Sequence, residues 1–266
     1  MKLKNKVALI TGAALGFKAG GSSIGSAIAL KFASEGAKIV AVDINEEMGR
    51  KTIEQIIENG GEGIFIKADL SKTEDVRKTI SHTEEAFKEL HILVNCAAAY
   101  EGDIFRNVVD IPEEDWKNTI DVNLNGYFRF AKYAIPLMLK SGGGAIINIS
   151  SSAAFKVIKN FCVYPVTKAA IDALTRTLAL DFAPKIRTNS ICPGFVRIAN
   201  SEGNRTPKEI EDWIGNIAKA YPLKRVCSVE EIANTALFLA SDDSSYINGQ
   251  SIIVDGGRMI SDIHEF

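Results

Sequence analysis

Tyr164 and Lys168 have the spacing of a proton-transfer pair. They lie in the run Cys162-Val-Tyr-Pro-Val-Thr-Lys168, and on a helix a separation of four positions places both side chains on one face, one turn apart. An ammonium beside a phenol stabilises the phenolate and lowers a pKa that is otherwise about 10. Tyr164 can then donate and accept a proton near neutral pH. Because surface helices often carry Tyr-x-x-x-Lys by chance, the pair needs support from the rest of the chain.

Three serines precede this pair. Ser150, Ser151 and Ser152 directly follow the apolar stretch Ala145-Ile-Ile-Asn-Ile149. A strand that ends in a hydroxyl, followed by a helix that carries Tyr and Lys, would surround one carbonyl oxygen with hydrogen-bond donors. The pattern therefore predicts a site for acid–base chemistry at a carbonyl or alcohol group.

A glycine-rich loop near the start of the chain predicts a phosphate site. The run Thr11-Gly-Ala-Ala-Leu-Gly-Phe-Lys-Ala-Gly-Gly-Ser-Ser-Ile-Gly25 lies between a predicted first strand and first helix. Small residues let backbone N–H groups approach a pyrophosphate, with the positive end of the helix dipole behind them. The alternative is a glycine-rich connection without a ligand, and the position of the loop favours the nucleotide.

Asp43 strengthens the nucleotide interpretation. It ends the predicted second strand, close to the distance at which an acid grips the hydroxyls of an adenosine ribose. Its carboxylate would repel a 2′-phosphate, so NAD is predicted as the cofactor and NADP is disfavoured. The alternative is an aspartate that only caps the following helix.

The elements that must position these residues alternate along the 266-residue chain. Strands are predicted at 7–11, 38–43, 63–67, 92–95, 145–149, 188–192 and 251–254. Helices are predicted at 24–33, from 45 towards 59, from 71 or 73, and at 113–139, 164–182 and 228–239. Strands without polar alternation, separated by amphipathic helices, predict an α/β fold: a single doubly wound, Rossmann-type parallel β-sheet with helices on both faces, forming one domain over 1–266.

The composition excludes several classes of protein. A hydrophobic content of 46% and a charged content of 24% are ordinary for a globular protein, and a net charge of −2 gives no reason to expect nucleic acid or a membrane surface as a partner. The basic and apolar start resembles a signal peptide, but its apolar run is too short. Scattered cysteines and histidines predict reduced thiols, a cytoplasmic location and no metal site. They are Cys96, Cys162, Cys192, Cys227, His82, His91 and His264.

From about residue 6 to residue 257 the chain resembles the short-chain dehydrogenase/reductase family. The features that carry the resemblance are Thr11-Gly12 with Ile24-Gly25, Asp43, Asp69-Leu70, Asn95-Cys-Ala-Ala98, Asn123, Ser151, Tyr164 with Lys168, Pro193-Gly194 and Val254-Asp-Gly-Gly257.

The resemblance implies four catalytic roles. Tyr164 would pass a proton to or from the substrate oxygen while a hydride moves to or from the nicotinamide ring. Ser151, which the spacing to Tyr164 favours over its neighbours, would hold that oxygen by a hydrogen bond. Lys168 would bind the nicotinamide ribose and tune the tyrosine, and Asn123 would help a water relay connect the lysine to solvent.

The resemblance also implies the cofactor contacts. Asp69 and Leu70 would lie beside the adenine, and the backbone of Asn95 and Ala97 would contact the adenosine side. The full predicted set is Gly12, Ser23, Ile24, Gly25, Asp43, Asp69, Leu70, Asn95, Ala97, Tyr164, Lys168 and Val196.

The chain departs from the family pattern in several places. Its glycine-rich loop is about seven residues longer, and Ser23 replaces the middle glycine. Lys18 in the insertion would either reach a phosphate, which weakens the preference for NAD, or point to water. Cys96 alters the usual Asn-Asn-Ala-Gly motif, so local packing should differ. Ile198 replaces a threonine that usually binds the carboxamide, so this contact is expected from the backbone at Val196.

The segment at about 198–223 is predicted to form a substrate lid. Its apolar residues recur at helical spacing, so one face either packs on the body or, together with Phe195 and Phe161, lines an apolar substrate pocket. Such a pocket favours an alcohol or ketone with a sizeable carbon skeleton. The apolar residues of the lid are Ile210, Trp213, Ile214, Ile217 and Tyr221.

These features predict an NAD-dependent oxidoreductase that interconverts a small-molecule secondary alcohol and a ketone. The resemblance further implies a homotetramer, paired through the helices at 116–139 and 164–182. A 3-oxoacyl-thioester (acyl carrier protein) reductase using NADPH and a non-catalytic nucleotide-sensing protein are the alternatives. Enoyl reductases of the superfamily carry their lysine seven positions after the tyrosine; Ile171 occupies that position here, so enoyl reduction is disfavoured.

Overall fold

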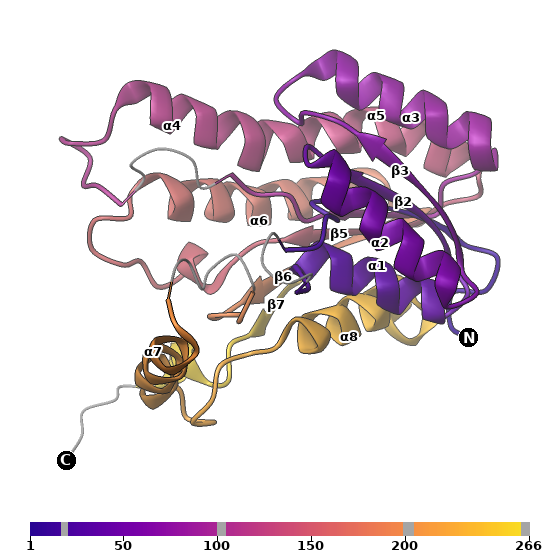
Figure 1. Ribbon diagram of the computed structural model, residues 1–266. Helices are drawn as coiled ribbons and strands as arrows, with labels where there is room; N and C mark the ends of the chain where they lie inside the picture. The colour runs from indigo at the N-terminus through magenta and orange to yellow at the C-terminus, as the bar shows by residue number, and fades with distance from the viewer. Residues whose placement is uncertain (17–20, 100–104, 199–204, 262–266) are drawn as a thin grey trace.

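Seven parallel strands form one sheet at the centre of the protein, in the order β3-β2-β1-β4-β5-β6-β7. The computed structural model describes residues 1–16, 21–99, 105–198 and 205–261 (Figure 1). The strands are β1 (Val7–Thr11), β2 (Lys38–Asp43), β3 (Glu62–Lys67), β4 (Ile92–Asn95), β5 (Gly144–Ile149), β6 (Ile186–Pro193) and β7 (Ser251–Val254). The predicted fold class is confirmed.

The strands lack polar alternation because both faces of the sheet are covered. Every residue of β1 and of β4 is buried, as a parallel sheet between two helix layers requires. β1 pairs with β2 on one side and with β4 on the other. The winding of the chain therefore reverses between β1 and β4, and a crevice for ligands is expected at the carboxyl ends of these strands.

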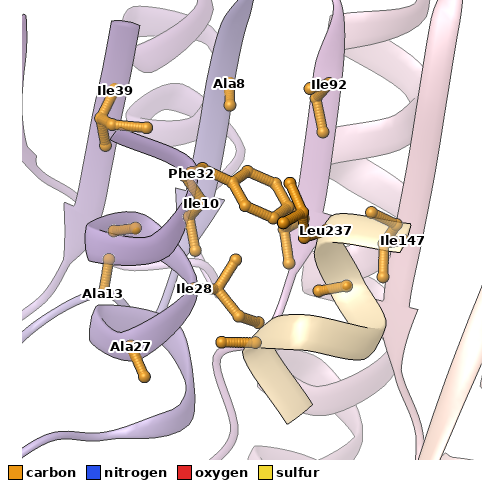
Figure 2. Close-up of a cluster of buried hydrophobic side chains, with 14 of the residues drawn as sticks. Ala8, Ile10, Ala13, Ala27, Ile28, Phe32, Ile39, Ile92, Ile147 and Leu237 are labelled. Atoms are coloured by element: carbon orange, nitrogen blue, oxygen red, sulfur yellow. The ribbon is translucent and has the colours of Figure 1, made fainter. Parts of the chain in front are cut away.

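Helices cover the two faces. One layer consists of α1 (Ile24–Ser34), α2 (Glu46–Glu58) and α8 (Val229–Ala240) (Figure 1). Figure 2 shows how Ile28 and Phe32 of α1 and Leu237 of α8 pack on Ile10 and Ile147 of the sheet. The other layer contains α3 (Thr73–Phe87), α5 (Gly126–Lys140) and α6 (Val163–Asp181), whose apolar faces form a second core. The helices of both layers pack an apolar face against the sheet. The carboxyl ends of the strands therefore remain available for a ligand site.

Polar side chains set where several helices begin. The Ser23 side chain accepts a hydrogen bond from the backbone of Ser26 at the start of α1, and Asn45 caps α2 as the sequence predicts. Ser228 and Glu231 form a reciprocal capping box at the start of α8. These caps satisfy amides that a helix leaves unpaired at its first turn.

The predicted helix at 113–139 is interrupted. The structure contains α4 (Glu113–Ile120), a π-helical segment (Asp121–Asn125) and then α5. The Arg129 guanidinium fixes this segment, because it donates to the Asp121 carboxylate at 2.6 Å, to the Asp121 carbonyl at 3.1 Å and to the Leu70 carbonyl at 3.1 Å. π segments are frequent at functional sites, and this one carries Asn123.

The helix α7 (Pro207–Lys219) lies apart from both helix layers (Figure 1). It begins at a capping box between Thr206 and Glu209, so its start is stabilised locally. Among the described residues, no helix has both the length and the apolar character that a membrane span requires.

Candidate active site

Lys168 is a buried cation on α6. Its side chain is only 1% exposed, and its ammonium donates to the Ile149 carbonyl at the end of β5 over 2.7 Å. The ammonium also lies 5.4 Å from the ring centroid of Tyr164. An ammonium has three protons to donate, so two remain for other acceptors beside Tyr164.

Tyr127 is a second aromatic neighbour of the Lys168 ammonium, and the sequence analysis did not identify it. Its ring centroid lies 5.4 Å from the Lys168 ammonium, and its hydroxyl donates to the same Ile149 carbonyl over 3.2 Å. Burial raises the pKa of Tyr127 well above its ordinary value, so it stays a neutral donor. The available signal was its position four residues after Asn123 on an otherwise apolar helix face.

The serines before α6 have different environments. Ser150 is buried and donates to the Lys168 carbonyl over 3.0 Å, so its proton is committed to holding the helix. The Ser151 hydroxyl oxygen accepts from the Ala153 amide over 3.1 Å, which leaves its proton available for a substrate oxygen. This difference supports the prediction of Ser151, rather than Ser150, as the substrate-binding serine.

Asn123 ties the π segment to the chain that follows β4. Its side-chain oxygen accepts from the Ala99 amide over 2.7 Å, and its side-chain nitrogen donates to the Ala99 carbonyl over 3.3 Å. The side chain is therefore a brace between two segments that border the crevice. A water relay at this position, as the resemblance implies, would have to use the main chain of the π segment.

The glycines of the phosphate loop allow two close backbone approaches. Gly12 has φ +68°, and a Cβ there would lie 2.7 Å from the Ala97 Cα; a Cβ on Gly25 would lie 2.1 Å from the Gly12 carbonyl oxygen. The Ser23 hydroxyl closes the loop by donating to the Ala14 carbonyl over 2.7 Å. Ile24 opens α1 directly behind it, so the helix start points its amides at the loop. Lys18 lies outside the described residues.

Asp43 is not the cap of α2, because Asn45 accepts the hydrogen bond from the Met48 amide over 3.1 Å. The Asp43 carboxylate instead accepts from the Ala14 amide at 3.0 Å and from the Asn45 amide at 2.9 Å. These bonds orient it between the phosphate loop and the end of β2. A carboxylate has about four acceptor positions, so it can still accept from two ribose hydroxyls.

The Thr11 hydroxyl links the end of β1 to the residues that follow β4. Thr11 accepts from the Cys96 amide over 3.0 Å and from the Ala97 amide over 3.2 Å. The Asn95 side chain points inwards and donates to Asn148 over 2.9 Å. Burial raises the pKa of Cys96 to about 12, so the altered motif holds a neutral thiol. The chain near Asn95 and Ala97 thus offers backbone, rather than side chains, to the crevice.

Two further predicted contacts follow β3. Asp69 holds the turn there, because its carboxylate accepts from the Ser71 amide over 3.0 Å and from the Ser71 hydroxyl over 2.6 Å. Leu70 is buried, and its Cβ would lie 3.1 Å from a Cβ placed on Gly126. The segment with the predicted adenine contacts therefore packs against the first turn of α5.

Val196 lies in an isolated bridge next to Cys227. The Cys227 amide donates to the Phe195 carbonyl over 3.1 Å, and the Arg197 amide donates to the Cys227 carbonyl over 2.9 Å. In a parallel bridge of this kind the amide and carbonyl of the central residue point the other way. The Val196 backbone is thus oriented away from Cys227, as the predicted carboxamide contact requires.

Aromatic rings extend from Tyr164 to the surface. The Tyr164 ring stacks on Phe161 with centroids 5.0 Å apart, and Phe161 stacks on Phe105 with centroids 4.7 Å apart. On α7 the predicted apolar face is only half-buried, and none of its residues is fully buried. Packing on the body therefore accounts for only part of this face. The rest of the face is accessible to solvent, as the predicted lid requires.

Comparison with known proteins identifies the family. A family model described as enoyl-(acyl carrier protein) reductase matches residues 19–258. An uncharacterized oxidoreductase of Thermotoga maritima is 40% identical over 262 residues, which cover 97% of this chain and 98% of the relative. The chain belongs to the short-chain dehydrogenase/reductase family. It is an oxidoreductase, and the relatives support an enzyme that acts on CH–OH groups.

Other members of the family have named activities. A cyclohexanol dehydrogenase of an Acinetobacter species is 36% identical, with 96% of this chain and 95% of the relative covered. A solved structure of a Thermoplasma acidophilum aldohexose dehydrogenase superimposes with a TM-score of 0.86 at 31% identity and covers 99% of this chain and 98% of that one.

Membership of this family implies an NAD(P) cofactor, and the residues present fit one. Gly12 and Gly25 leave no room for side chains where the loop meets the start of α1. The Asp43 carboxylate and the Lys168 ammonium would supply an acceptor and a donor for two riboses. Among the described residues there is no group of three or more His, Cys, Asp or Glu side chains that could hold a metal ion.

Proposed function

We propose that the protein is an NAD-dependent oxidoreductase that interconverts a secondary alcohol and a ketone, with Tyr164 as the general acid and base. The observation that carries this proposal is the buried Lys168 ammonium, bonded to the Ile149 carbonyl and 5.4 Å from the Tyr164 ring centroid. A buried cation is costly unless it is paired or used. Its position beside a phenol at the carboxyl edge of the sheet suits proton transfer.

Each residue has its own role in the reduction of the ketone. Lys168, at the nicotinamide ribose, and the Val196 backbone, at the carboxamide, would hold a nicotinamide that would supply the hydride for the carbonyl carbon of the ketone. The Tyr164 hydroxyl gives its proton to the carbonyl oxygen, while Ser151 donates a hydrogen bond to that oxygen and stabilises its developing negative charge. Lys168 stabilises the phenolate left on Tyr164 until it regains a proton from solvent. Alcohol oxidation runs through the same groups in reverse.

The preference for NAD over NADP rests on Asp43. Two backbone amides hold its carboxylate at the end of β2, where the adenosine ribose would bind. A 2′-phosphate there would place two negative charges within a few ångströms, which is unfavourable in a partly buried site. We therefore assign NAD as the cofactor.

The apolar side chains around Tyr164 favour an apolar, ring-containing substrate. Phe161 and Phe105 form a stacked aromatic wall beside Tyr164, and residues 205–223 present the half-buried apolar face of α7 as the described part of the lid. The similarity to a cyclohexanol dehydrogenase supports this assignment. Ile171 is buried at the position where enoyl reductases carry their lysine, which argues against enoyl reduction.

We also propose that the protein is a homotetramer in the cytoplasm. Large apolar side chains remain exposed on the two helices that the sequence predicts to pair between subunits, a feature typical of interfaces. The four cysteines are free thiols, as a reducing compartment favours. The exposed apolar residues are Phe128 and Leu139 on α5 and Val166 and Leu180 on α6.

Oxidation of NADH with a panel of carbonyl compounds tests the function. The panel contains cyclohexanone, an aliphatic 2-ketone, an aldohexose lactone and a 3-oxoacyl thioester, each with NADH and with NADPH. We expect the highest kcat/KM for the cyclic ketone with NADH, and a kcat that is roughly 10³-fold lower in Tyr164→Phe. Turnover of the thioester alone, with NADPH, would establish the reductase alternative. Tight cofactor binding without turnover of any substrate would favour nucleotide sensing.

A further inference from the structure

Tyr221 connects the lid to the cofactor side of the crevice. It follows α7 in the chain, and its side chain is 8% exposed. The Phe195 amide donates to the Tyr221 hydroxyl oxygen over 2.8 Å. Phe195 directly precedes Val196, whose backbone is the predicted contact for the nicotinamide carboxamide. A lid residue thus holds the peptide next to the cofactor contact.

Phe195 makes a second contact with the lid. Its ring meets the indole of Trp213 edge-on, with centroids 5.2 Å apart and planes at 87°, which is a favourable geometry for two aromatic rings. Trp213 lies in the middle of α7, and the Arg205 guanidinium lies 4.5 Å from the centroid of its ring system. The middle and the end of the described lid therefore both contact one residue of the crevice.

The remaining bonds of this segment leave it little freedom. The Gly194 amide donates to the Val254 carbonyl of β7 over 2.9 Å. The Phe195 carbonyl and the Arg197 amide bond to Cys227. The bonds to Cys227 fix the two peptides that flank Val196, and the bond from the Phe195 amide to Tyr221 fixes the peptide before them. Phe195 is therefore held on both sides, which limits the direction of the Val196 amide that follows it. Of these bonds, only the one to Tyr221 uses a side chain, and that side chain belongs to the lid.

We propose that Tyr221 is a positioning residue that aims the Val196 amide at the nicotinamide carboxamide, and that Trp213 couples the same segment to the lid. Placement of the lid helix and placement of the nicotinamide then favour each other, and by linkage this coupling is reciprocal. The proposal rests on the proposed function, because it requires a nicotinamide in the crevice. It adds a specific role for two lid residues in cofactor binding.

The variant Tyr221→Phe tests the positioning role, because it removes only the oxygen that accepts from Phe195. Dissociation constants for NADH and for ADP-ribose, which lacks the nicotinamide, are measured by calorimetry. We expect the constant for NADH to rise about tenfold, since a partly buried amide loses its partner, and the constant for ADP-ribose to stay within about twofold. Tyr246→Phe, at a fully exposed tyrosine, is the matched control and should change neither constant.

Unchanged ADP-ribose binding also shows that the variant is folded. Equal weakening of both ligands would overturn the proposal, because it would indicate a general structural role for Tyr221. Unchanged NADH binding would overturn it as well. A wild-type protein that binds NADH no more tightly than ADP-ribose would instead count against the proposed function, so the two failures are distinguishable.

Tryptophan fluorescence tests the coupling to the lid without a substrate. The chain has two tryptophans, so Trp116→Phe leaves Trp213 as the only reporter. We expect NAD to shift the emission maximum of Trp213, ADP-ribose to leave it in place, and Tyr221→Phe to abolish the shift at saturating NAD. Equal responses to both ligands, or a shift that survives in Tyr221→Phe, would overturn the coupling.

Discussion

The helix α6, which carries the proposed acid–base pair, and the helix α7, which is the proposed lid, are both amphipathic, but they differ sharply in burial. Ten residues of α6 are buried, and they include Tyr164 and Lys168; no residue of α7 is buried. Segments with few buried contacts are the ones that open at low cost in free energy. The proposed acid–base groups thus lie on a preformed surface, whereas the proposed substrate contact lies on a helix that can adapt.

The polar bonds of the two helices show the same difference. A buried chain of side-chain hydrogen bonds runs from Asn95 on β4 through Asn148 on β5 to Thr175 on α6, with distances of 2.9 Å at each step. The capping bonds of α7 are local, between Thr206 and Glu209. Positions on α6 are therefore set by the sheet, and those on α7 largely by the helix itself.

The largest expected effect comes from the proton donor on α6. Tyr164→Phe should lower kcat by roughly 10³-fold, within the range typical for loss of general acid–base catalysis, because the ring remains while the transferred proton is lost. The dissociation constant for NADH should change less than about twofold, since the substitution removes one hydroxyl and leaves the ring in place. Steady-state kinetics and calorimetry measure both. Retained turnover would contradict the assigned role.

A pair of isoleucines tests the difference in burial directly. Ile171→Ala on α6 should lower the free energy of unfolding by about 2–5 kcal/mol, because a fully buried side chain leaves a cavity. Ile214→Ala on α7 should cost less than about 1 kcal/mol, since its side chain is only half-buried. Urea denaturation measures both values.

The effects of the same two substitutions on KM should have the reverse order. Ile214→Ala should raise KM for an apolar ketone several-fold, while the folded fraction of Ile171→Ala should keep its KM. If the two variants lose equal stability, α7 packs as firmly as α6 and the comparison of the two helices fails.

Asp43 is expected to have a smaller effect, confined to cofactor choice. Asp43→Asn removes the charge and keeps one acceptor for the loop amides, so kcat/KM for NADPH relative to NADH should rise about tenfold, or about 1.4 kcal/mol. Asn45→Ala is the control: it removes the cap of α2 without touching the ribose contact, so it should lower stability and leave the ratio unchanged. An unchanged ratio in Asp43→Asn would contradict the predicted contact.

Local patterns were sufficient to predict the fold. The β-branched, apolar runs of β1, β2, β4 and β7 begin and end at the predicted residues, because a strand buried on both faces leaves a continuous apolar stretch. Asn45, as a cap, and the Tyr164–Lys168 pair are also recognisable, since the spacing within one helix determines what they can contact.

Long-range contacts could not be predicted in the same way. The π segment depends on the Arg129 guanidinium, which bonds to the backbone of Leu70, 59 positions away. The contact between Tyr221 and Phe195 joins residues 26 positions apart, and Tyr127 reaches Lys168 only because α5 and α6 share one face of the sheet. In each case the chemistry depends on tertiary packing, which leaves no periodic signal in the sequence.

The smallest predicted effect arises at the amino ends of the strands, on the side of the sheet opposite the proposed active site. His91 precedes β4, is buried, and accepts from the Val7 amide over 3.1 Å. Burial, with the nearby Lys6 charge, holds the pKa of His91 below its ordinary value of 6.5 in spite of Glu89. The unfolded chain therefore binds more protons than the folded one at pH values between the folded pKa and 6.5.

The stability from neutral His91 is fully present above pH 6.5 and is lost as the pH falls from 6.5 towards the folded pKa. His91→Asn keeps an acceptor for Val7 but does not titrate, so its urea midpoint should change less between pH 7.5 and 5.5 than that of the wild type. The difference should be below about 1 kcal/mol, and the ratio of NADH to ADP-ribose affinity should be the same in both proteins. Equal pH dependence in the two proteins would show that folding does not change the pKa of His91. A changed affinity ratio would show that this side of the sheet, and not only α6 and the lid, controls the nicotinamide site.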